Sequence, residues 1–132
     1  MLLAAAAFVG FVSVAFGAYS EHGLRPRVSA ETFRFLMTAV RYNQVHALAA
    51  AVVGGMILAA PDADGLLLRI AGWGFVAGMV LFSGSIYVSA LLDRPALTKL
   101  APVGGTVLML AWLALCAVGI DASVSGGLIA NP

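Results

Sequence analysis

The sequence predicts an all-α membrane protein: four transmembrane helices in a compact bundle, with an amphipathic extension leading into helix 2. The first observation is composition, because the 132 residues are 62% hydrophobic and 10% charged, with a mean hydropathy of +1.03. A soluble domain of this size could not cover that much apolar surface, so most of the chain must be solvated by lipid. The second observation is the length of the apolar stretches. Four apolar stretches of a single domain are each long enough to span, near residues 2–20, 44–60, 66–92 and 100–120.

The first apolar stretch is predicted to be a membrane helix. It runs for nineteen uncharged residues, from Leu2 to Ser20. A cleaved signal peptide would need a positively charged start, and no Lys or Arg occurs before Arg25. Gly23 and Pro26 are typical of a helix end, so the first span should stop there.

The second span should begin with an amphipathic segment, for which Ser29 offers an N-cap. Helical spacing predicts a polar face and an apolar face. A continuous helix over residues 29–60 would be roughly 48 Å long, whereas the hydrocarbon core is about 30 Å thick. The first third must therefore lie in the interface, protrude or bend. The polar face would hold Glu31, Arg34, Thr38 and Arg41, and the apolar face Phe33, Leu36, Met37 and Val40.

Small residues in the third and fourth spans predict close helix packing. Gly74 and Gly78 lie one helical turn apart, which lets a neighbouring backbone approach. Gly104 and Gly105 follow Pro102 at the start of the fourth span, where proline is tolerated. We expect these four glycines to lie at helix contacts.

The basic residues predict the orientation of the bundle. Four spans place both termini on one side and the first and third loops on the other. Six of the seven basic residues belong to the second side and one to the first, and the positive-inside rule then places the first and third loops in the cytoplasm and both termini outside. The six are Arg25, Arg27, Arg34, Arg41, Arg94 and Lys99, and the single one is Arg69.

Polar groups gather where the first and third loops meet the spans, which predicts a cluster at the cytoplasmic leaflet. Hydrocarbon offers these groups no partner, so we expect them to turn inward and bond one another. Tyr42 and His46 are neighbours on one helix face. Three alternatives stay open: plain packing, a ligand or proton site, and a haem held by His22 and His46. The cluster comprises His22, Arg41, Tyr42, His46, Ser83, Ser85 and Tyr87.

Glu21 lies beside this cluster and offers Arg41 a partner across the first two helices. The alternative is that Arg41 faces water or lipid headgroups, as the rest of its polar face does. In the first arrangement Glu21 contacts Arg41, and in the second it does not.

Four motifs of the chain resemble the YgdD-like family (DUF423), a domain-of-unknown-function group of small bacterial inner-membrane proteins with mitochondrial relatives. The resemblance covers nearly the whole chain and implies a four-helix membrane protein, without an established reaction. The chain departs from it at Ser20-Glu21 and at Ala101, where the family more often has Gly-Ala and Thr. The motifs are Phe16-Gly17-Ala18 with His22-Gly23-Leu24, Arg41-Tyr42 with His46-Ala47-Leu48, Leu81-Phe82-Ser83-Gly84-Ser85-Ile86-Tyr87, and Pro102-Val103-Gly104-Gly105.

Neither a catalytic triad, a metal-ligand cluster nor a phosphate loop occurs in the sequence, so we expect no enzyme and no cofactor. A net charge of +1 gives no basis for nucleic-acid binding. The bilayer is the expected partner, with other membrane proteins or a second copy of the chain as further ones.

Three classes of function remain. The favoured class is a structural or accessory subunit of a membrane complex. A small transporter or proton-coupled permeation unit would require a water-filled cavity that reaches His46. A lipid- or quinone-binding protein would require an acyl-sized groove beside the amphipathic segment.

Overall fold

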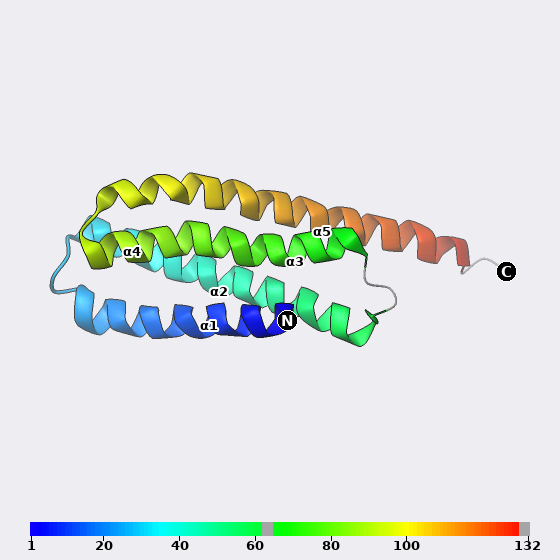
Figure 1. The fold of residues 1–132 in the computed structure, drawn as a ribbon, viewed down its shortest axis with the longest axis horizontal. Helices are drawn as coiled ribbons and strands as arrows, with labels where there is room; N and C mark the ends of the chain where they lie inside the picture. The colour runs from blue at the N-terminus through cyan, green and yellow to red at the C-terminus, as the bar shows by residue number, and fades with distance from the viewer. Residues whose placement is uncertain (62–64, 130–132) are drawn as a thin grey trace.

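Four apolar helical rods lie side by side in the computed structural model, which describes residues 1–61 and 65–129 (Figure 1). Each is long and apolar enough to cross a membrane, and together they confirm the predicted all-α class. In Figure 1 the N-terminus and the described end of the fourth rod lie toward one end of the bundle, and the loops around residues 25–29 and 93–94 lie at the other. The rods are Leu2–Leu24, Ala30–Ala59, Leu66–Leu92 and Pro95–Ser125.

The first rod consists of α1 (Leu2–Tyr19) followed by a wide π-helical turn, η1 (Ser20–Leu24). No proline or charged residue interrupts the run before Ser20, so the helix continues through the apolar stretch. It packs along α2.

The second rod is a single helix, α2 (Ala30–Ala59), which joins the amphipathic segment to the apolar run without a break. The Ser29 hydroxyl accepts a hydrogen bond from the backbone N–H of Thr32 (3.1 Å), as its N-cap position predicts. Leu36 and Val40 are buried, whereas Arg34 and Arg41 are exposed. The helix runs obliquely across its neighbours in Figure 1.

The third rod comprises α3 (Leu66–Met79), the π-helical turn η3 (Val80–Gly84) and α4 (Ser85–Leu92). It ends where Asp93 adopts a left-handed conformation with φ 50°, and the Ser89 hydroxyl donates to the carbonyl of Arg94 (3.0 Å). These local bonds satisfy backbone groups that the helix end would otherwise leave free.

The fourth rod begins with a 3₁₀ segment, η4 (Pro95–Leu100), and continues as α5 (Ala101–Ile129). It packs against α3 over a contact of small residues. A Cβ atom placed on Gly78 would lie 2.7 Å from the Leu108 side chain, and one on Gly104 would collide with the backbone of Phe82. Both positions therefore need glycine, because any larger residue would separate the two helices.

Candidate functional site

A groove lies between α2 and α5, with a volume of about 360 Å³. Its α2 side combines polar and apolar residues, and its α5 side is apolar. Phe75 and Phe82 of the third rod stand behind it and contact the rings at its edge. The lining residues are Arg41, Tyr42, Val45 and His46 from α2, and Gly105, Leu108, Met109 and Trp112 from α5.

His46 is the polar group that lies deepest in this α2–α5 groove, and it is only 7% exposed. Its Nδ1 atom lies 2.6 Å from the carbonyl oxygen of Tyr42. A carbonyl can only accept, so Nδ1 carries a proton, and in the corresponding neutral tautomer Nε2 is the acceptor. Among the described residues no protein group bonds that Nε2 atom. The groove therefore contains an unused hydrogen-bond acceptor.

Rings surround this acceptor. Tyr42 stacks on Phe82, with 4.9 Å between ring centroids and 27° between planes. His46 lies 5.9 Å from Phe75 and 6.1 Å from Trp112. The sequence prediction missed the three rings outside α2, although Phe75 and Phe82 lie seven residues apart on one helical face. That spacing alone does not distinguish a binding wall from ordinary packing.

The position of His46 along the bundle bears on its predicted place at the cytoplasmic leaflet. His46 lies near the middle of α2 and contacts rings far from the ends of the third and fourth rods, rather than at the loop end of the bundle. The expectation of an inward orientation holds for His46 and is wrong for Tyr42, which is 45% exposed. His22 is exposed as well, and so is Arg41, which agrees with the alternative that Arg41 faces water or headgroups. A long charged side chain gains more from reaching the headgroups than from burial.

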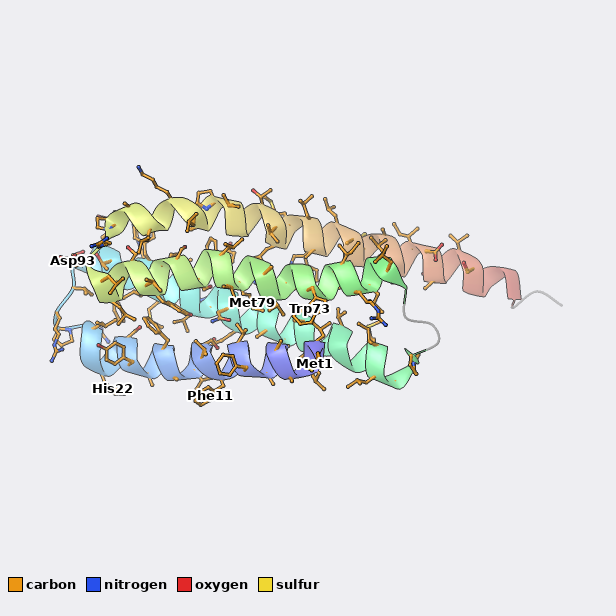
Figure 2. All side chains as sticks on the ribbon, in the orientation of Figure 1. Met1, Phe11, His22, Trp73, Met79 and Asp93 are labelled. Atoms are coloured by element: carbon orange, nitrogen blue, oxygen red, sulfur yellow. The ribbon has the colours of Figure 1, made fainter. Side chains whose placement is uncertain are left out.

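A second groove, of about 340 Å³, lies between α1 and α2. His22 lines it and lies at the end of the first rod in Figure 2. Because His22 and His46 line different grooves, one haem iron between them is not compatible with this fold. The residues that line this α1–α2 groove are Val14, Gly17, Ala18, Glu21, His22, Met37, Val40, Arg41 and Gln44.

Glu21 bonds Arg25 within its own helical turn, at 2.8 Å. The predicted alternative, a pair between Glu21 and Arg41, is therefore wrong. Within the part of the chain that the structure describes, Arg41 forms no ion pair or hydrogen bond. Arg41 lines both grooves.

The serines and Tyr87 of the predicted cluster lie in the helix contacts rather than in either groove. The Ser83 hydroxyl, in η3, donates to the carbonyl of Ala39 on α2 (2.8 Å). Ser85 donates to the carbonyl of Phe82 in its own rod (2.8 Å). These bonds are to backbone oxygens, so the expected network of side chains does not form.

Tyr87 is buried and stacks on Phe16 of α1, with 3.9 Å between ring centroids. Its hydroxyl accepts a hydrogen bond from the Asn43 amide nitrogen (3.4 Å). The Oδ1 atom of Asn43 and the hydroxyl of Ser20 are buried without a partner among the described residues. The predicted cluster omits both residues. Whether a polar side chain is buried in a helix contact depends on the folded arrangement, and no sequence pattern indicates it.

The comparisons with known proteins agree with this architecture. The family described as "Protein of unknown function (DUF423)" matches residues 16–105. A UPF0382 membrane protein of Haemophilus influenzae is 31% identical, over 83% of this chain and 85% of that one. The UPF0382 membrane protein YwdK of Bacillus subtilis is 30% identical, over 83% and 87%.

The UPF0382 inner membrane protein YgdD of Escherichia coli is 33% identical, over 89% of this chain and 87% of that one. No solved structure matches the chain. The names of the relatives and the four apolar rods together show an integral membrane protein.

Proposed function

Because the chain belongs to the DUF423 family of membrane proteins, whose name specifies no activity, we propose a function from its own geometry: it binds an amphipathic membrane ligand in the α2–α5 groove, without catalysis. The observation that carries this proposal is the unused Nε2 acceptor of His46, which sits among apolar walls. The Arg41 guanidinium at the groove's edge adds a donor.

Burial explains why a ligand is needed. The Nε2 atom of His46 opens into the groove, where lipid tails offer it no partner, and a polar atom left without a partner in apolar surroundings costs about 1–3 kcal/mol. A molecule with a polar head and an apolar body would satisfy His46 and Arg41 and would cover Leu108 and Trp112. This is the pattern of small-molecule sites in general, which are mostly apolar with a few placed polar groups.

The accessory-subunit alternative loses part of its support. It rested on small-residue faces that a partner could contact, and three of those glycines are used inside the chain. Gly74 and Gly78 face α5, and Gly104 faces the third rod. A role beside other membrane proteins or a second copy would have to use the remaining lipid-facing surface.

The transporter alternative gains from the depth of His46, since transport sites lie near the membrane midplane. The walls of the groove argue for the lipid-like ligand instead, because Val45, Leu108 and Met109 give an ion no partners. We therefore favour a binding role, and we propose that the protein sits with both termini outside the inner membrane, as the charge distribution suggests.

A filled groove tests this function. A Cβ atom on Gly105 would lie 3.8 Å from the Phe82 ring, which is ordinary contact, so Gly105→Leu begins without a clash at Cβ and adds bulk to the groove that Gly105 lines. We expect the variant to lose a bound amphiphile that the unaltered protein retains in mild detergent, measured by native mass spectrometry.

Gly119→Leu is the matched control, because a Cβ atom there meets nothing within 4 Å. It lies on the same helix and should keep the amphiphile. Equal occupancy in the two variants would contradict the proposal.

A further inference from the structure

We propose that the ligand of the α2–α5 groove is a quinol, a flat aromatic ring with two hydroxyl groups and an apolar tail, and that the groove prefers it to the oxidised quinone. This inference rests on the ligand-binding function proposed above. It names the chemistry of the head that the groove recognises.

The walls favour a ring. Tyr42 and Trp112 line the groove, and both are fixed by other rings: Tyr42 stacks on Phe82, and Trp112 meets Phe75 edge to face at 4.9 Å and 69°. Aromatic pairs at such distances gain from face and edge geometry beyond the area they bury. An acyl chain would gain only from burial, whereas a flat ring would gain from both.

The size of the groove agrees with one ring. Its volume of about 360 Å³ lies at the lower end of the range for small-molecule sites, roughly 300–1,000 Å³. One substituted ring and the first part of a tail fit such a space, with the remaining tail in the bilayer. A phospholipid with two acyl chains would leave most of its body outside.

The proton on His46 selects the reduced form. The Tyr42 carbonyl holds the proton on Nδ1, so the neutral imidazole offers the groove only an acceptor, Nε2. A quinol hydroxyl can donate to that atom. A quinone has carbonyl oxygens alone and would leave Nε2 unpaired, which is the costly arrangement for a buried group. Arg41 can donate to the second oxygen of either form.

The chain offers its own reporter for a binding test. It has two tryptophans, and Trp73 is half exposed on α3 (Figure 2), whereas Trp112 lines the groove. In a Trp73→Phe background, quenching of fluorescence reports on Trp112 alone. The measurement titrates a short-tailed benzoquinol, and separately its quinone, into the protein in phosphatidylcholine nanodiscs under anaerobic conditions.

We expect saturable quenching by both forms, with the quinol bound about tenfold more tightly. His46→Phe keeps a ring and removes the acceptor, so it should abolish this preference and leave the quinone affinity within about twofold. The unchanged quinone affinity also shows that the variant is folded. His22→Phe, in the other groove, should keep the preference.

Equal affinities for the two forms, tighter binding of the quinone, or a preference that survives in His46→Phe would each overturn the inference. So would displacement of the quinol when anionic phospholipid replaces phosphatidylcholine, because the polar groups would then serve a phosphate head. If any of these occurs while Gly105→Leu still loses its amphiphile, the proposed function stands and only the quinol is wrong. If Gly105→Leu loses nothing, the proposed function is wrong as well.

Discussion

At the scale of single residues, polar side chains inside this bundle differ in how well they are satisfied. Ser83 donates a short bond to a carbonyl of the neighbouring helix. Asn43 is 2% exposed, yet it makes one long bond to Tyr87 and leaves Oδ1 without a partner among the described residues. Hydrogen bonds between membrane helices are worth about 0.6 kcal/mol on average, so such a pair stabilises the fold little.

Removing one or both partners of this pair tests its contribution to stability. Tyr87→Phe takes away the one partner that the Asn43 amide has among the described residues, and it should lower the free energy of unfolding in detergent by about 1 kcal/mol. Adding Asn43→Leu replaces both partners by apolar groups and should restore it. A double variant less stable than Tyr87→Phe alone would mean that Asn43 has a further partner, such as a ligand or an internal water.

At the scale of helices, the contact between the third rod and α5 depends on backbone approach. η3 places Phe82 against Gly104, and a Cβ atom on Gly104 would strike backbone that cannot rotate away. Gly105, one residue on, has room for a Cβ atom. The adjacent glycines therefore have different roles, although the sequence analysis predicted a helix contact for both.

Substituting alanine at Gly104 and at Gly105 tests whether the two glycines differ in their contribution to stability. Gly104→Ala should lower the free energy of unfolding by about 1–3 kcal/mol through overpacking. Gly105→Ala should leave stability unchanged or raise it by up to about 1 kcal/mol, because alanine is the better helix former. Thermal unfolding in detergent measures both, and equal losses would show that the backbone contact does not decide the stability.

The helices could be predicted because lipid acts on every residue of a span, so hydropathy and charge are enough to find them. Ser29 as an N-cap and Pro102 in a first turn are local effects, and the structure agrees with both. The π-helical turns could not be predicted, since a widened turn depends on what packs against it. The α2–α5 groove was missed for a similar reason, because His46 and Trp112 meet only after folding.

At the scale of the whole molecule, charge is concentrated at one end of the bundle. The end with the first and third loops carries Arg25, Arg27, Arg94 and Lys99 in exposed positions. Orientation depends on these loop charges and the membrane potential rather than on contacts within the fold. The orientation therefore stays a prediction from composition, whereas the position of His46 along α2 and its ring contacts needed the coordinates.

Accessibility to an impermeant thiol reagent tests the orientation in intact cells. Cys116 is exposed, so the variants need a Cys116→Ala background. We expect a cysteine at Pro61 to react and one at Lys99 to stay unlabelled until the membrane is opened. The reverse pattern would invert the proposed orientation and leave the four-helix fold intact.

Arg41 has a consequence for the molecule as a whole, because it lines both grooves. One guanidinium cannot turn fully toward two occupants at once. A ligand that draws it into the α1–α2 groove removes a donor from the α2–α5 groove, and the reverse holds with the same free energy. Occupants of the two sides of α2 therefore compete for a single charge without touching each other.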